Sequence, residues 1–319
     1  MNPVVPAALK VAIDDLLQGV SRKDLAARSQ GISTAYRGGD GSARAIASEA
    51  DVLAYLVARL PATYAVAAAA LDQVREAVPD FTPRLVLDAG GGPGTASWAA
   101  RETWPNLRAT LTDANRPFLA VATKLAPDIE ALLRDLVRDD LPSADLVIAS
   151  FVLAEIAAAA QAPLIRKLFA ATTDILVLIE PGTPAGFERL RAARTALIEQ
   201  RANVLGPCTH ANTCPMRGGD WCHFSQRLPR SRDHLQAKGG SVPYEDERYA
   251  WLAVSRTRRS AFEGQARVLA PPAEAKPGIT FKLCAPDGLE RRFVARRDRE
   301  AFAAHRRAGW GDLVVGVVG

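Results

Sequence analysis

The chain has 319 residues, of which 48% are hydrophobic and 24% charged, and its formal net charge is +5. This is enough apolar material for one large domain or two smaller ones. No apolar run reaches the roughly 18–20 residues that span a bilayer, so we expect no membrane partner. No signal peptide opens the chain, and we therefore expect a cytoplasmic protein in a reducing compartment.

Residues 1–80 are predicted to form an N-terminal helical region. Apolar residues recur there at helical spacing. The predicted helices are Val5–Leu17, Arg22–Ser29, Ala43–Arg59 and Tyr64–Val78. Pro61 and Pro79 punctuate this region.

Residues 81–203 alternate between predicted strands and helices. The predicted strands are Arg84–Asp88, Leu107–Thr112, Ala131–Leu136, Ala144–Ser150 and Asp174–Ile179. The predicted helices are Thr95–Thr103, Arg116–Leu125, Gln161–Ala171 and Pro184–Asn203. Such alternation indicates an α/β fold, with a Rossmann-like parallel sheet that has helices on both faces.

Residues 204–319 are predicted to hold a cysteine-rich loop and a basic, β-rich region. The predicted elements are strands at Arg248–Ser255, Gly264–Leu269, Thr280–Cys284 and Glu290–Ala295, a helix near Arg299–Arg307 and an apolar tail, Asp312–Val318. Arginines are dense in this third of the chain, which favours a polyanionic partner such as nucleic acid. A solvated basic surface is the alternative.

A glycine-rich turn, Asp88-Ala-Gly-Gly-Gly-Pro-Gly-Thr95, lies between a predicted strand and a predicted helix. This is the context that a nucleotide-binding loop requires, but the spacing is not the dinucleotide fingerprint and lacks the Lys-Ser/Thr of a P-loop. An acid directly before the glycines is unfavourable beside a pyrophosphate. It is favourable beside the cationic end of S-adenosylmethionine.

The turn resembles motif I of the class I S-adenosylmethionine-dependent methyltransferases. That resemblance implies a cofactor site made of glycines and of acids at three successive strand ends: Asp88, Gly90, Gly92, Gly94, Asp113 and Asp135. Asp88 and the glycines would flank the methionine part of the cofactor, Asp113 would bind the ribose hydroxyls, and Asp135 would lie beside the adenine. The alternative is a strand–helix turn that binds nothing.

The sequence identifies no catalytic residue. Ser150-Phe-Val-Leu follows the fourth predicted strand, where amino-group methyltransferases of nucleic acids often carry Asn/Asp-Pro-Pro-Tyr/Phe. Pro207-Cys208 matches the Pro-Cys of cytosine-C5 enzymes only superficially. Glu155 is either a general base or a helix cap, and Glu180 either touches a ligand or organises its own turn. The sheet is therefore compatible with cofactor binding without methyl transfer.

All four cysteines can be ligands of one metal site: Cys208, Cys214, Cys222 and Cys284. The first three lie among turn residues, which bend freely, and four thiolates suit a zinc ion or an iron–sulfur cluster. Two alternatives stay open. The thiols are buried and inert, or a zinc site uses His210 or His223.

Motifs from both halves of the chain occur in one order: Arg59-Leu-Pro-Ala-Thr-Tyr64, the glycine turn through Trp98, Pro207-Cys-Thr-His, Cys214-Pro, Trp221-Cys-His-Phe-Ser-Gln-Arg227 and Cys284-Ala-Pro-Asp-Gly288. Together they resemble the methyltransferase-like assembly factors of the mitochondrial small ribosomal subunit and their bacterial relatives, from about Tyr36 to Asp312. The resemblance implies a 4Fe-4S cluster on the four cysteines and binding to small-subunit rRNA. It also implies a bacterial, cytoplasmic protein, and no DNA partner is expected.

Three functions follow from these patterns. The first is a ribosome assembly factor that binds S-adenosylmethionine and a 4Fe-4S cluster. The second is an active rRNA methyltransferase in which the cluster is structural. The third is a small-molecule methyltransferase with a structural zinc site and no nucleic-acid partner, and the density of arginines argues against it.

Overall fold

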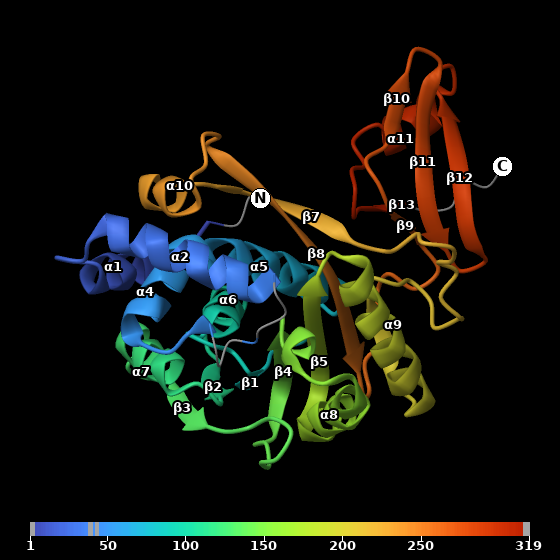
Figure 1. The fold of residues 1–319 in the computed structure, drawn as a ribbon. Coiled ribbons are helices and arrows are strands. Elements are labelled where there is room, and N and C mark those ends of the chain that lie inside the picture. Colours follow the sequence, from blue (N-terminus) through green and yellow to red (C-terminus); the bar gives the residue numbers. More distant parts are fainter. Residues whose placement is uncertain (1–3, 38–40, 42–44, 315–319) are drawn as a thin grey trace.

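The computed structural model describes residues 4–37, 41 and 45–314. A sheet with the strand order β3-β2-β1-β4-β5-β8-β6 forms its centre, and β7 also pairs with β8 (Figure 1). Strands β1 to β5 are parallel, and β8 runs antiparallel to both β5 and β6. The predicted α/β fold with a methyltransferase-type, Rossmann-like sheet is thereby confirmed. Its strands are β1 (Leu85–Ala89), β2 (Arg108–Asp113), β3 (Glu130–Leu133), β4 (Ala144–Ser150), β5 (Thr172–Pro181), β6 (Asn203–Gly206), β7 (Phe224–Pro229) and β8 (Tyr244–Ser255).

Helices cover both faces of this sheet. Successive side chains of a strand point to opposite faces, so neighbouring residues pack under different helices. Val177 packs in the core under α5 (Leu60–Ala77) and α6 (Thr95–Thr103). Its neighbour Leu176 packs in the core under α8 (Ala158–Ala171) and α9 (Pro184–Glu199). The central strands are therefore apolar on both faces, as is typical of parallel sheets.

The remaining N-terminal helices form a third core with α7 (Arg116–Leu125). They are α1 (Ala7–Leu16), α2 (Arg22–Arg37) and α4 (Glu49–Ala58). Ser48 and Asp51 form a capping box at the start of α4. Among the described residues no single helix is long and apolar enough to cross a bilayer, whereas the pair α4 and α5, bent by 58°, passes on length and composition.

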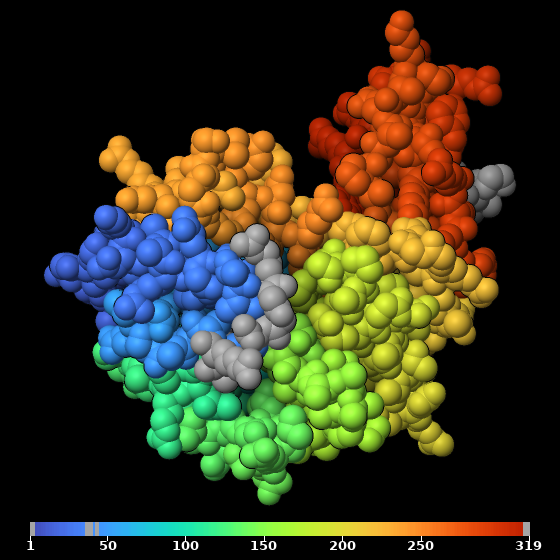
Figure 2. Space-filling model, in the orientation of Figure 1, coloured from blue at the N-terminus to red at the C-terminus, as the bar shows by residue number. Residues whose placement is uncertain are grey.

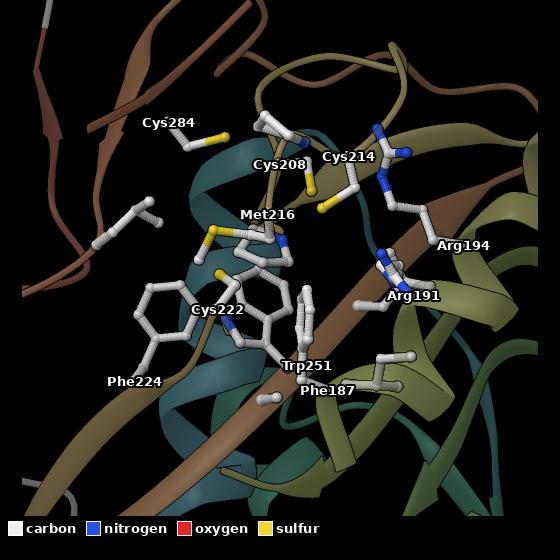
Figure 3. A pocket seen from close by; sticks show the side chains of 16 residues that line it. Phe187, Arg191, Arg194, Cys208, Cys214, Met216, Cys222, Phe224, Trp251 and Cys284 are labelled. Atoms are coloured by element: carbon white, nitrogen blue, oxygen red, sulfur yellow. The ribbon is translucent and has the colours of Figure 1, made fainter. Parts of the chain in front are cut away.

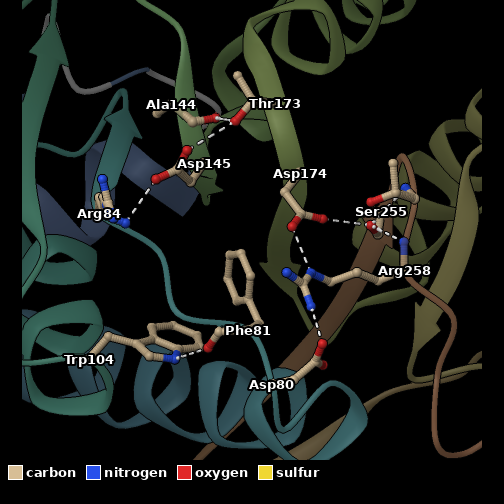
Figure 4. Close-up of polar contacts among 11 residues, drawn as sticks. Asp80, Phe81, Arg84, Trp104, Ala144, Asp145, Thr173, Asp174, Ser255 and Arg258 are labelled. Carbon is tan, nitrogen blue, oxygen red and sulfur yellow. Dashed lines mark hydrogen bonds and ion pairs between the residues drawn. The ribbon is translucent and has the colours of Figure 1, made fainter.

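Polar contacts close the edge of the sheet opposite the glycine turn (Figure 4). Asp145, at the start of β4, accepts a hydrogen bond from the backbone N–H of Arg84 at 2.8 Å. Arg258 bridges Asp80 and Asp174 at 2.7 and 2.6 Å. These contacts fix the amino ends of β1, β4 and β5, and leave their carboxyl ends to form the site.

Two features extend beyond the main sheet. The outer half of β8 pairs with β7 to form an arm, and α10 (Arg232–Lys238) between them packs on α2 and α4. A second sheet, in the order β10-β11-β9-β13 with β12 on β11, stands out from the body of the molecule (Figure 2). Its elements are β9 (Ala266–Val268), β10 (Ala273–Ala275), β11 (Gly278–Ala285), β12 (Gly288–Ala295), α11 (Arg299–His305) and β13 (Leu313–Val314).

The structure corrects several predicted boundaries. The third strand ends at Leu133, so Asp135 lies two residues beyond it. The helix predicted over Ala43–Arg59 is observed from Glu49 to Ala58, and residues 42–44 lie outside the described part. The predicted tail contributes only Leu313 and Val314, since residues 315–319 are not described.

Candidate functional site

The glycine turn joins β1 to α6 at the carboxyl edge of the sheet. Gly90, Gly92 and Gly94 have φ angles of +68°, +57° and +85°, which L residues rarely adopt. A Cβ atom on Gly91 would lie 2.3 Å from the side chain of Asp88. The backbone therefore folds tightly around that aspartate, and only glycine fits the turn.

Asp88 is fully buried beneath the turn. Its Oδ2 accepts hydrogen bonds from the backbone N–H and the hydroxyl of Ser97, each at 2.8 Å. Burial raises the pKa of Asp88 to about 6. Its Oδ1 has no hydrogen-bond partner among the described residues, and a buried acceptor of this kind is stabilised by a cationic or hydrogen-bonding ligand.

Asp113, at the end of β2, is in direct contact with the same turn. Its Oδ2 accepts from the backbone N–H of Gly92 at 2.9 Å, and its Oδ1 accepts from that of Asn115 at 2.7 Å. Burial, reinforced by nearby Glu155, raises its pKa to about 6. Each carboxylate oxygen has a second lone pair, so both can still accept from a pair of ligand hydroxyls.

Asp135 is placed differently. Its Oδ1 accepts from the backbone N–H groups of Val137 and Arg138 at 2.8 and 3.2 Å. The carboxylate thus organises the turn that follows β3. The structure brings Asp88, the glycines and Asp113 into contact with one another, and it gives Asp135 partners in its own turn.

Glu180 organises the segment that follows β4. It is fully buried, and it accepts from the backbone N–H of Leu153 at 3.0 Å and from Arg189 at 2.6 Å. Burial raises its pKa although Arg189 opposes the shift. Glu180 therefore holds the short 3-10 helix Leu153–Glu155 beside the mouth of the site.

The sequence analysis missed Tyr55 of α4 as a residue of this mouth. Burial raises the pKa of Tyr55, and the nearby carboxylates of Glu155 and Asp113 add to the shift, whereas Arg59 opposes it. The N-terminal helices therefore supply one wall of the carboxyl edge. The helix–Pro–helix pattern of Asp51–Tyr64, which contains Tyr55, was the available signal.

The four cysteines line one cavity of about 50 Å³ (Figure 3). Cys208 follows β6, Cys222 precedes β7, and Cys284 lies on β11, while Cys214 comes from the loop between the first two. In Figure 3 their sulfur atoms point toward a common space. The rest of the wall is largely apolar and includes Phe187, Leu190, Met216, Trp251 and Leu269.

Among the described residues, no three His, Cys, Asp or Glu side chains stand close enough to hold one metal ion. Of the two histidines in the zinc alternative, His210 lies next to a candidate ligand, with its Nε2 3.6 Å from the sulfur of Cys284, whereas His223 stacks on Trp221. Burial raises the pKa of the Cys284 thiol to about 12, and the neighbouring thiols add to the shift.

Arg267 of β9 lies beside the cavity, and the sequence analysis missed it. It is only 2% exposed. Its guanidinium donates to the carbonyl of Pro207 at 2.9 Å, and to Gln73 and the carbonyl of Gly311 at 2.7 Å each. Burial lowers its pKa to about 10, while Cys222 and Cys208 act in the opposite direction.

A second buried arginine, Arg194 of α9, lines the cavity. It donates to the backbone carbonyls of His210 and Asn212 at 2.7 and 2.8 Å. In the part of the chain that the structure describes, several buried polar atoms around the cavity have no hydrogen-bond partner: Arg194 Nε, Thr209 Oγ1, His210 Nδ1 and Arg267 Nη2. Buried donors without partners indicate a place for an anionic or acceptor-rich group.

A hydrogen bond and an ion pair join the cysteine loop, between Pro207 and Cys222, to both sheets. The indole of Trp221 donates to the carbonyl of Gly182, directly after β5, at 3.0 Å. Lys282 of β11 pairs with Asp220 of the loop at 2.5 Å. The cavity therefore lies at the junction between the main sheet and the second sheet.

Residues 49–315 match the family described as "Mitochondrial small ribosomal subunit Rsm22". The chain is 27% identical over 290 residues to the human "Ribosome assembly protein METTL17, mitochondrial", covering 82% of this chain and 62% of that protein. It is 25% identical over 352 residues to "Rsm22-cox11 tandem protein 2, mitochondrial" of Schizosaccharomyces pombe, covering 92% of this chain and 46% of that protein. The chain thus spans less than two thirds of the length of these relatives.

Similar solved structures share the fold at low identity. A putative RNA methyltransferase, PH1948, from Pyrococcus horikoshii matches 63% of this chain and 86% of its own, with 17% identity and a TM-score of 0.41. The plantazolicin methyltransferase BpumL matches 78% of this chain and 99% of its own, with 12% identity and a TM-score of 0.44.

The expectation of a bacterial, cytoplasmic protein is wrong. It rested on the lack of a recognisable signal peptide and on the bacterial relatives of the family that the chain resembles, whereas the matching family and the human and yeast relatives are all described as mitochondrial.

Proposed function

Because the chain belongs to the mitochondrial small ribosomal subunit Rsm22 family, we propose that it is an assembly factor that binds the rRNA of the small ribosomal subunit. The family match over residues 49–315 carries this proposal. The charge distribution supports an RNA partner. Residues 264–310 hold ten Lys and Arg against five Asp and Glu, whereas the rest of the chain holds 30 of each kind.

We further propose that the carboxyl edge binds S-adenosylmethionine. Asp88 and the glycines would flank the methionine part, Asp113 would accept from the ribose hydroxyls, and Asp135 would lie beside the adenine. The buried Oδ1 of Asp88, which has no partner among the described residues, supports a cationic ligand at this place.

The four thiols are proposed to hold a 4Fe-4S cluster through Cys208, Cys214, Cys222 and Cys284. A cluster takes one thiolate at each of four irons and so needs more widely spaced ligands than a single zinc ion. Two observations support it: the four thiols line one cavity, and Nε of Arg194 and Nη2 of Arg267 lack hydrogen-bond partners in the described structure. The cluster would supply structure by joining the cysteine loop to β11.

An anaerobic preparation tests the cluster directly. We expect a broad visible absorption band and about four irons and four sulfides per chain. Cys284→Ser should lose most of the iron, whereas Met216→Leu, which changes the same wall without removing a thiol, should keep it. One zinc and no iron per chain would contradict the proposal.

Cofactor binding is tested by calorimetry with S-adenosylhomocysteine. Asp113→Ala should abolish binding, and Asp128→Ala, which alters an exposed carboxylate, should not. The segment Ser150–Glu155 carries no recognisable catalytic motif, so assembly by binding alone is the simpler role. Incubating immature small subunits with methyl-labelled cofactor separates the roles, since label in rRNA would show that the chain is an active methyltransferase.

A further inference from the structure

The second sheet separates its residues sharply between two faces. Ile279, Phe281, Leu283 and Val294 form its buried core. On the opposite face, Phe293 of β12 lies across from Thr280, and Arg291 lies across from Lys282. Ala273 of β10 extends the row of Thr280 and Phe293 across three strands.

Phe293 is the most exposed large hydrophobic side chain among the described residues of this sheet. It is 53% exposed, and its ring lies over Gly278, where a Cβ atom would approach the ring to 2.8 Å. The residues that lie across from Phe293 on the neighbouring strands are small, so its ring projects from a nearly flat surface. We call this surface the Phe293 face, and its residues are Ala273, Ala275, Gly278, Thr280, Arg291 and Phe293.

Charge is also separated between the two faces. The acids of these strands, Glu274 and Glu290, lie on the face of the sheet opposite to Phe293, and each is paired with an arginine. Arg291 lies on the same face of the sheet as Phe293 and is exposed. The Phe293 face therefore combines an exposed aromatic ring with a cation, and β10, β11 and β12 place no acid on it.

We propose that the Phe293 face binds an unpaired segment of RNA, with a base stacked on Phe293 and a phosphate paired with Arg291. This inference rests on the proposed rRNA-binding function and assigns it a surface. Aromatic rings on an open sheet face stack on splayed bases, and such stacking needs single strands because helical RNA hides the faces of its bases. The exposed large apolar side chains of these strands are Phe293 and the 41% exposed Leu289, which is less than the contiguous apolar patches that mark protein-binding sites.

The test measures the affinity of the full chain for a fluorescein-labelled single-stranded oligouridylate by anisotropy, over a series of salt concentrations. Phe293→Ala should weaken binding about tenfold without changing the salt dependence, because stacking is not electrostatic. Phe293→Trp should retain the affinity. Arg291→Ala should reduce the slope of log affinity against log salt by about one phosphate contact.

The matched control is Lys10→Ala, which removes one exposed positive charge from α1 and should change neither quantity. Unchanged affinity in Phe293→Ala would overturn the inference, as would an equal loss for a duplex of the same length. If Phe293→Ala lost binding to the small subunit but kept its affinity for RNA, the Phe293 face would bind a protein instead, and the inference would be overturned. If the wild-type chain does not bind RNA, the rRNA-binding function itself fails.

Discussion

Arg267 is a side chain on which three segments that are distant in sequence meet. It joins Gln73 of α5, Pro207 of the cysteine loop and Gly311 near β13. Removing a buried guanidinium that makes several hydrogen bonds is costly, because the carbonyls that it leaves behind lose their partners.

Arg267→Met should therefore lower the free energy of unfolding by about 3–5 kcal/mol. Guanidinium unfolding monitored by circular dichroism measures this loss. The control is Arg259→Met, since Arg259 is 76% exposed and its removal should cost little. Equal stability of the two variants would show that the network around Arg267 contributes nothing.

Asp88 gives stability an unusual pH dependence. Its pKa is about 6 in the folded chain and 3.8 when unperturbed, so the folded state binds the proton more tightly. Between about pH 4 and pH 6 its contribution to stability is therefore lost as the pH rises, and it stays lost above that range.

Asp88→Asn removes this loss of stability at rising pH, because an amide does not ionise. Relative to the wild type, the variant should gain up to about 2–3 kcal/mol of stability as the pH rises from 4 to 7. Chemical denaturation of both proteins at several pH values checks this. A difference that is constant with pH would contradict the burial argument.

The sequence predicted the site residues unevenly, for physical reasons. Asp88 and Asp113 could be predicted because each ends an apolar strand, and a glycine-rich turn follows the first of them, which are local patterns. Arg194 and Arg267 were not, because the role of a buried arginine depends on distant carbonyls. The only local signals were an arginine between the apolar Ala266 and Val268, and another on the apolar face of α9.

At the scale of elements, the arm of β7, α10 and β8 is held together by Glu245. This carboxylate contacts Arg230 at 3.3 Å, His234 at 3.1 Å and also Lys238. Burial alone would raise its pKa, but the hydrogen bonds from His234 and Lys238 hold the pKa well below its usual range. The stabilisation is therefore present above about pH 4.5 and is lost as the pH falls below it.

Glu245→Gln should loosen α10 from α2 and α4, at a cost of about 1–2 kcal/mol. Hydrogen exchange at neutral pH should become faster in α10 while β1 and β4 stay protected. Asp246→Asn is the matched control, because Asp246 lies next on the same strand in a more exposed pair with Arg227. Exchange in α10 that matches the wild type would contradict this role.

Local patterns predicted some elements well and others not at all. The bounds of α6, α7 and β4 agree with those expected, since clear apolar periodicity and turn residues delimit them. The strand β7 and the helix α10 were missed, because their polar and basic residues gain order only by packing on β8 and the N-terminal helices.

At the scale of the whole molecule, the second sheet is joined to the body largely around the cysteine cavity. Cys284 and Lys282 of β11, and Trp310, contact the cysteine loop. The division into 1–80, 81–203 and 204–319 stays a prediction. The structure places β6 and β8, from the third of these parts, within the main sheet, and no local pattern reveals such long-range pairing.

Removing the proposed cluster should loosen this junction. Treatment with an iron chelator and oxidant should make the loop between Pro207 and Cys222 sensitive to protease, while the main sheet stays resistant. Cys284→Ser should show the same cleavage without chelator. Equal resistance of the treated and untreated proteins would mean that the junction does not depend on a metal group.

The network around Arg267 also sets the order in which the molecule can be built. During synthesis, β1 to β4 can pair with one another and with β5 as soon as they emerge, because all their partners precede residue 182, whereas β5 also needs β8. The cavity must wait for Cys284, and Arg267 must wait for the carbonyl of Gly311. A chain interrupted before residue 311 thus exposes a buried charge and an unfinished cavity.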